Sequence, residues 1–264
     1  MTEIPAGVYG PVRWETLPPH VYPSGAVLRG FNDAMNLKSG PLRMSVCHLK
    51  PGQDIEHHRH YTMCELYFLM SGRGQFRIDD QVFDVEEHSA CYFTPEPMRS
   101  VANNSNEDAW WLFVGTPPVV KPGQEPPPEV RALDLPTIEP PPDLKPFYGP
   151  VRWETMPVST VDTVGAEIRG FTDTLNLKSG LLRASVCRLP AGHDMQHHRH
   201  STMTEIHYLM KGQGQLRVED TVIDVPENSG VYVVPEPMRS CINNSNEDAW
   251  WFFAGSPPDV KKMY

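Results

Sequence analysis

The chain has 264 residues, 39% of them hydrophobic and 21% charged, and a formal net charge of −10 at pH 7. That length suffices for one large or two modest globular domains. The negative charge argues against nucleic acid or an anionic membrane as a partner, because both select basic surfaces.

The N-terminal stretch and its near copy in the second half indicate a duplication. YGPVRWET occurs at residues 9–16 and 148–155, and NNSNEDAWW at 103–111 and 243–251. A repeat this long is a whole copied domain, because a solenoid unit has only roughly 20–50 residues. Between the copies, the proline-rich segment 117–146 predicts an extended, semi-stiff linker. We therefore expect an N-terminal domain of residues 1–116 and a C-terminal domain of residues 147–264.

Short β-rich runs follow one another in each copy, and helical periodicity is scarce. In the first copy, LRMSVCHL (42–49) ends at a turn, and CELYFLM and GQFRIDD flank SGRG in the pattern of a hairpin. QVFDVEE, ACYFTP and WWLFVG continue the series. Strands at roughly 8–12-residue intervals without helices predict an all-β sandwich or barrel in each half. In each WW pair we expect one ring in the core and the other at a domain interface.

A polar cluster interrupts these runs twice, as HHRHYTMCE (57–65) and HHRHSTMTE (197–205). Alternate residues of a strand face the same side, so His58 and His60 are expected to point together into the barrel, within reach of Glu65 on the next strand. The second copy repeats this with His198, His200 and Glu205. Such a set suits divalent Fe, Mn, Zn, Ni or Cu. The alternative is a set of buried structural hydrogen-bonding groups or surface polar residues, but burying it without a shared partner would be costly.

Both segments resemble the first motif of the cupin superfamily, G-x5-H-x-H-x(3,4)-E-x6-G, at residues 52–72 and 192–212. The resemblance implies a bicupin: two tandem jelly-roll β-barrels, each with a metal site in its mouth. Both copies depart from the second family motif, P-x-G-x-x-H-x-x-x-N. Ser100 and Ser240 stand where the family has its fourth ligand, a histidine.

The remaining two histidines and one glutamate form the ligand set of non-haem iron oxygenases. The resemblance therefore favours an Fe(II) dioxygenase that acts on a small oxygenated metabolite, and disfavours manganese oxalate-degrading chemistry, which in the family uses three histidines and a glutamate. A metal-dependent isomerase or cyclase is the first alternative. A non-catalytic bicupin that binds small molecules is the second.

Further candidates come from strand parity. Tyr67 and His207 occupy equivalent inward positions beside the glutamates, Tyr67 as a substrate contact and His207 as a ligand or acid–base group. Glu56 shares the parity of His58 and is a third catalytic candidate.

Substrate contacts are expected from arginines and from the two serines. Arg43 and Arg183 could bind a carboxylate through two hydrogen bonds, although a surface salt bridge explains them equally well. Ser100 and Ser240 are expected to face the site. The neighbouring Arg99 and Arg239 then turn outward, unless the prolines before them bulge the strand.

The cysteines and the N-terminus bear on the compartment. Five cysteines, of which only Cys47 and Cys187 match between the copies, indicate reduced thiols and a cytoplasmic protein. The first residues lack the apolar core of a signal peptide, and no stretch has the roughly 20 apolar residues that span a bilayer. We expect a small-molecule substrate and no nucleic-acid or membrane partner. The sequence does not decide whether the chain forms a homo-oligomer, because two fused barrels can reproduce the pairing of a dimer within one chain.

Overall fold

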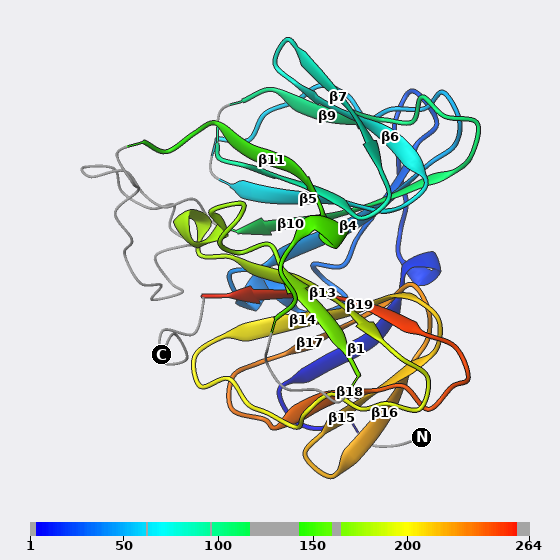
Figure 1. Ribbon diagram of the computed structural model, residues 1–264, viewed down its shortest axis with the longest axis vertical. Coiled ribbons are helices and arrows are strands. Elements are labelled where there is room, and N and C mark those ends of the chain that lie inside the picture. Colours follow the sequence, from blue (N-terminus) through cyan, green and yellow to red (C-terminus); the bar gives the residue numbers. More distant parts are fainter. Residues whose placement is uncertain (1–3, 62, 96, 117–142, 160–164, 258–264) are drawn as a thin grey trace.

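A computed structural model of the chain describes residues 4–61, 63–95, 97–116, 143–159 and 165–257. Most of the expected linker, residues 117–142, lies outside the described residues, so its form stays a prediction. The described chain is built from β-strands and four short 3-10 helices, η1 (Trp14–Thr16), η2 (Leu37–Ser39), η3 (Trp153–Thr155) and η4 (Leu177–Gly180). None of its helices has the length and apolar character needed to cross a membrane. The all-β prediction is confirmed, and the strands form two stacked jelly-roll barrels (Figure 1).

Each barrel consists of one large and one small antiparallel sheet. In the first barrel the large sheet has the order β11 (Phe147–Arg152), β8 (Ser89–Phe93), β5 (Cys64–Ser71), β10 (Ala109–Thr116), β4 (Arg43–Leu49), β3 (Val27–Gly30), β2 (His20–Val21). The small sheet has the order β7 (Gln81–Glu86), β6 (Arg73–Ile78), β9 (Arg99–Ala102).

The second barrel repeats this plan. Its large sheet has the order β1 (Val8–Arg13), β17 (Ser229–Val233), β14 (Thr204–Lys211), β19 (Ala249–Ser256), β13 (Arg183–Leu189), β12 (Glu167–Gly170). Its small sheet has the order β16 (Thr221–Val225), β15 (Gly214–Val218), β18 (Arg239–Ile242).

The two barrels exchange their first strands. β1, from the start of the chain, pairs with β17 of the second barrel, and β11 pairs with β8 of the first. Figure 1 shows the dark blue β1 among the yellow-to-red strands of the lower barrel and the green β11 among the strands of the upper barrel. The expected domain bounds follow the sequence repeat, whereas each sheet takes one strand from across them. The barrels are therefore interlocked as well as packed together.

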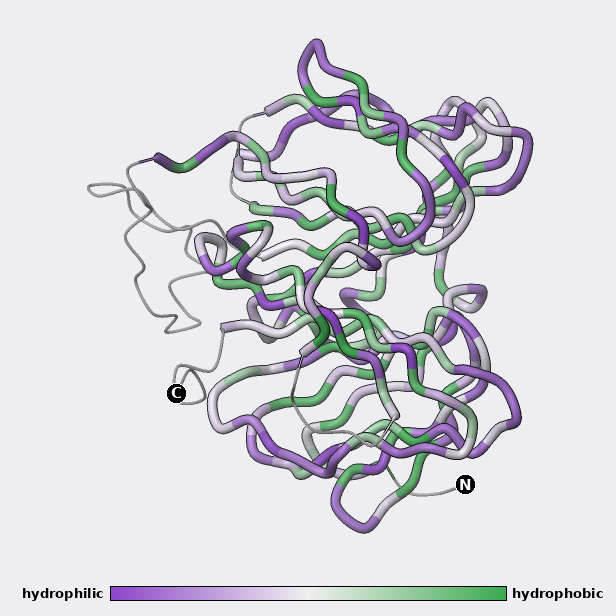
Figure 2. The backbone as a smooth tube through the Cα atoms, viewed as in Figure 1, coloured by the Kyte–Doolittle hydropathy of each residue, from purple (hydrophilic) through white to green (hydrophobic). Residues whose placement is uncertain are grey.

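Strand alternation divides the apolar residues between two kinds of core. On β5, Leu66 and Phe68 join a cluster that spans both barrels, whereas Tyr67 and Leu69 face the interior of the first barrel. Each buried leucine or phenylalanine contributes roughly 1.5–3 kcal/mol relative to exposure, so the large inter-barrel cluster holds the barrels together. Figure 2 shows hydrophilic residues gathered on the loops at the outer ends of the molecule.

The tryptophan pairs follow the same division. Trp111 and Trp251 are fully buried inside their barrels. Trp110 packs edge-to-face on Trp14 with ring centroids 4.9 Å apart, within the inter-barrel cluster. The prediction of one ring in the core and one at the interface is confirmed.

The expected hairpin around SGRG is wrong. β5 pairs with β8 and β10, whereas β6 pairs with β7 and β9. The chain leaves one sheet for the other at Gly72, whose φ of +85° suits glycine and where a Cβ atom would clash with the backbone oxygen of Asp108. A glycine-rich turn between two strand-like runs marks a corner of the barrel here.

Candidate metal centres

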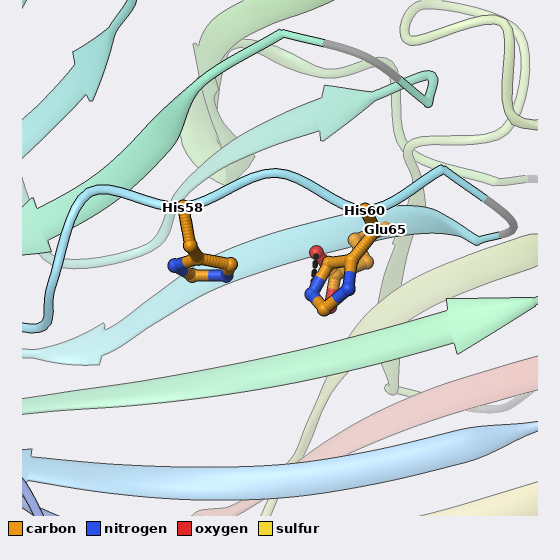
Figure 3. A group of neighbouring side chains, drawn as sticks. All are labelled: His58, His60 and Glu65. Atoms are coloured by element: carbon orange, nitrogen blue, oxygen red, sulfur yellow. Dashed lines mark ion pairs between the residues drawn. The ribbon is translucent and has the colours of Figure 1, made fainter.

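Two groups of side chains converge as the spacing of the repeated motif requires. His58 and His60 lie on the segment between β4 and β5, and Glu65 is on β5; one ligand atom of each lies within 4.8 Å of the others. His198, His200 and Glu205 meet within the same distance in the second barrel. In Figure 3 the ring of His60 lies directly beside the carboxylate of Glu65, with His58 further along the same segment.

The histidines do not lie on a continuous strand, so this part of the prediction is wrong. His58 forms only an isolated bridge with Arg99, in which each backbone N–H donates to the carbonyl of the other residue, at 3.0 and 2.7 Å. The rings of His58 and His60 still lie together, with centroids 5.0 Å apart. The segment that carries the two histidines is therefore held by this single bridge to β9, a strand distant in sequence, and not by a ladder of strand hydrogen bonds.

Backbone hydrogen bonds orient the first histidine of each pair. The Nδ1 atoms of His58 and His198 lie 2.8 and 2.9 Å from the carbonyl oxygens of Glu56 and Gln196. A carbonyl only accepts, so Nδ1 carries the proton and Nε2 is left as a donor atom for a metal ion. Burial lowers the pKa of His60 and of His198, despite the opposing charge of Glu65 or Glu205. Both imidazoles are therefore neutral at neutral pH, the form that binds metal.

Tyr67 lies within the first cluster. Its hydroxyl donates to Glu65 Oε2 at 3.1 Å and lies 3.3 Å from His58 Nε2. Burial raises the pKa of Tyr67 well above its usual value, the charge of Glu65 adds to this, and Arg99 opposes it. The phenol is therefore a proton donor at neutral pH. The structure places this predicted catalytic residue in contact with two candidate ligands.

The outward orientation predicted for Arg99 and Arg239 is wrong. Both are fully buried, and Arg99 donates from Nε and Nη2 to Glu65 Oε2 at 3.1 and 2.7 Å. The strand β9 starts only at Arg99, so parity extrapolated through the prolines before it does not hold. Arg99 shares the inward face with Val101, which is part of the core of the first barrel.

The same alternation turns Ser100 and Ser240 away from the clusters. Both are buried, and each pairs with an arginine of the neighbouring strand, Arg77 or Arg217. The structure does not bring them to the candidate ligands. The adjacent Arg99 and Arg239 face the clusters instead and contact Glu65 and Glu205.

A cavity of about 500 Å³ opens onto the first cluster. His58, His60, Glu65 and Tyr67 line it together with the following residues of its wall: Tyr22, Leu28, Asn32, Arg43, Met44, Ser45, Ile55, Glu56, Met63, Phe113 and Gly115. Glu56 and Arg43 are thus on this cavity, and their roles in catalysis and substrate binding stay predictions. Arg43 Nη1 also donates to the carbonyls of Leu37, Gly40 and Leu42 at 2.7–2.9 Å, which ties the η2 turn to β4.

The second cluster is more enclosed. The side chain of His200 is 6% exposed, against 36% for His60. His207 Nε2 lies 3.1 Å from Glu205 Oε2, and its Nδ1 lies 3.7 Å from Cys241 Sγ. Burial raises the pKa of Glu205, but His207, His200 and Arg239 outweigh it and hold this pKa well below its usual value. His207 thus contacts a candidate ligand, and among the described residues it is outside the group that could hold an ion.

The arginines of the second barrel are less engaged with the cluster. Arg239 Nε lies 3.4 Å from Glu205 Oε2. This single contact is longer than the two hydrogen bonds that Arg99 donates to Glu65. Arg183 is exposed at the start of β13, so its role in substrate binding stays a prediction.

The donor set fits a divalent transition metal in each barrel. Two neutral imidazoles and a carboxylate are the ligands that such ions take, and Nδ1 of the first histidine is fixed by a backbone carbonyl. The sequence reasoning missed Arg99, Tyr22 and Phe113. The repeat of PMRS in both copies was a signal for the arginine; for Tyr22 and Phe113, which come from distant strands, the sequence offered none.

Comparisons with known proteins agree with this architecture. A sequence profile described as "Cupin domain" matches residues 45–115. An uncharacterized protein of Methanocaldococcus jannaschii is 23% identical over 105 residues, 40% of this chain and 84% of that protein.

Solved structures match over nearly the whole chain. The protein Ylba from E. coli superposes with a TM-score of 0.68 and 11% identity, covering 98% of this chain and 95% of that one. An oxalate decarboxylase variant of B. subtilis gives 0.68 and 17%, with 98% and 79% covered. AerE from Microcystis aeruginosa gives 0.67 and 11%, with 94% and 98% covered. At these identities the similarity establishes the fold alone.

Proposed function

Because a cupin-domain profile matches residues 45–115 and the chain folds as two cupin-like barrels, each with a His–His–Glu cluster that could hold a metal ion, we propose that it is a metal-dependent enzyme. The specific proposal is an Fe(II)-dependent dioxygenase that acts on a small oxygenated organic molecule. The observation that carries it is the convergence of His58, His60 and Glu65 on a cavity of about 500 Å³. We assign the reaction to the first barrel, where this cavity admits a substrate.

In this proposal the residues around the first cavity have separate roles. His58, His60 and Glu65 would hold the ion, whose chemistry is the activation of dioxygen at positions that three protein ligands leave open. Tyr67 can donate its hydroxyl proton to an oxygen of a substrate in the cavity. Arg99 keeps the Glu65 carboxylate in place. Leu28, Ile55 and Phe113 provide an apolar wall that excludes water from part of the cavity.

A metal-dependent isomerase or cyclase is the second candidate. Tyr67 and Glu56 line the same cavity, so an acid and a base face one substrate. Such a reaction needs a divalent ion to polarise the substrate and consumes no oxygen.

Metal analysis and oxygen uptake test these proposals. Protein purified without oxygen and loaded with Fe(II) is expected to hold about two ions per chain. It should consume oxygen with some members of a panel of small phenols, enols and carboxylates, and a His58→Ala/His60→Ala variant should not. Conversion without oxygen uptake would favour the isomerase. A chain that binds no metal at any loading would overturn the enzymatic proposal and favour a non-catalytic binding protein.

A further inference from the structure

Arg99 is built into the first metal centre. Its side chain is fully buried, Nε and Nη2 bind Glu65 Oε2, and Nη1 donates to the carbonyl of Pro97 at 3.2 Å. Its backbone is bridged to His58. The guanidinium is thus fixed beside one candidate ligand and its backbone beside another.

This arrangement changes the charge of the centre. In a site with two neutral imidazoles and one carboxylate, the carboxylate offsets one of the two charges of a divalent ion. Here Arg99 already balances Glu65, at a contact of 2.7 Å. The other charged groups of the cavity wall, Glu56 and Arg43, have opposite signs and offset each other. A bound divalent ion would therefore keep its full double charge in a partly desolvated cavity, where charge interactions are stronger than in water.

From this charge balance we propose that Arg99 makes the first centre selective for anionic ligands. The substrate class is a small carboxylate, enolate or phenolate whose anionic oxygen meets the ion and whose apolar body lies against Leu28, Ile55 and Phe113. This inference rests on the proposed metal-dependent function and deepens it by naming the charge of the substrate. Arg99 acts through the charge and position of Glu65, so it is a positioning residue.

Azide and imidazole, one anionic and one neutral, test this selectivity as two small ligands for open metal positions. The protein is loaded with Co(II) in a His198→Ala/His200→Ala background, so that only the first centre contributes, and each ligand is titrated by visible absorption. Arg99→Gln retains amide donors for Glu65 but removes the charge, and is expected to weaken azide relative to imidazole by about tenfold or more. Arg99→Lys retains the charge and is expected to keep the ratio within about threefold. The matched control is Arg77→Gln, on β6, which removes one positive charge paired with Asp54 outside the cavity and should leave the ratio unchanged.

The outcomes separate the two proposals. If the background protein binds no cobalt, the metal-dependent function fails and the inference fails with it. If cobalt binds and Arg99→Gln leaves the azide-to-imidazole ratio unchanged, selection by Arg99 is overturned while the metal function stands. Should Arg99→Gln not fold, as judged by circular dichroism, the protein with Arg99 intact decides: binding of imidazole without binding of azide would overturn the inference.

Discussion

The two barrels have the same candidate ligands but differ in what surrounds them. In the first, the side chain of His60 is 36% exposed and lines a cavity, and the Tyr67 hydroxyl contacts two candidate ligands. In the second, His200 is 6% exposed, and His207 lies against Glu205 in the place of Tyr67. A duplicated domain thus preserved one ligand geometry in two surroundings. Ligand identity alone therefore does not tell which centre reacts with a substrate, and access to the centre is the better guide.

Removing the ligands of one barrel at a time is the strongest test of this difference. His58→Ala/His60→Ala is expected to lose about one metal ion per chain and all activity, because two of three ligands are gone. His198→Ala/His200→Ala should lose an equal amount of metal and keep most of the activity. Metal content by mass spectrometry and oxygen uptake measure both effects, with circular dichroism as the control for folding. Loss of activity only in the second variant would reverse the assignment.

Tyr67 and His207 occupy the equivalent inward position next to the candidate glutamate ligand of each barrel. Substituting each of them tests the role of the Tyr67 hydroxyl. Tyr67→Phe removes the hydroxyl and keeps the ring packed against Phe93 and Phe113. We expect kcat to fall about 100-fold with metal content nearly unchanged, because a positioned proton donor typically contributes that much. His207→Phe in the second barrel is the matched control and should change kcat by less than about threefold. Equal losses in both variants would contradict a special role for Tyr67.

The smallest effect is expected at an asymmetric contact between the barrels. His88 Nδ1 lies 2.9 Å from Glu154 Oε1, whereas the second copy has Asn228 at the position of His88. Burial raises the pKa of Glu154, but the bond with His88, its own backbone N–H and the charge of Arg152 outweigh this and lower the pKa. A lowered carboxyl pKa gives stability that is present above the unfolded value of roughly 4.3 and is lost as pH falls through the folded pKa.

His88→Asn should therefore lower the free energy of unfolding at pH 7 by about 0.5 kcal/mol, a value kept small because Glu154 is partly exposed. The difference from the unsubstituted protein should shrink below about pH 4. Urea unfolding at several pH values measures it, and His20→Asn, at an exposed histidine, is the control. A difference that grows towards acid pH would show that the contact does not act through the Glu154 carboxylate.

Much of the fold followed from patterns that are local in sequence. The repeated segments and the short strands predicted an all-β sandwich or barrel in each half, and the resemblance to the first cupin motif implied that these are jelly rolls. The H-x-H-x4-E spacing predicted that His58, His60 and Glu65 converge, and they do. The orientation of Arg99 could not be predicted, because alternation holds only within a strand and the prolines before Arg99 hide where β9 begins. The predicted orientation of Ser100 and Ser240 towards the site was wrong for the same reason.

The sequence by itself determined the duplication, the all-β class and the identity of the candidate ligands, because each depends on the order and spacing of nearby residues. Only the tertiary structure decided the exchange of β1 and β11, the burial of Arg99 against Glu65, and the cavity that distinguishes the first centre from the second. These features arise where segments distant in sequence meet. The free energy of such meetings depends on packing between strands, which no single stretch of residues encodes.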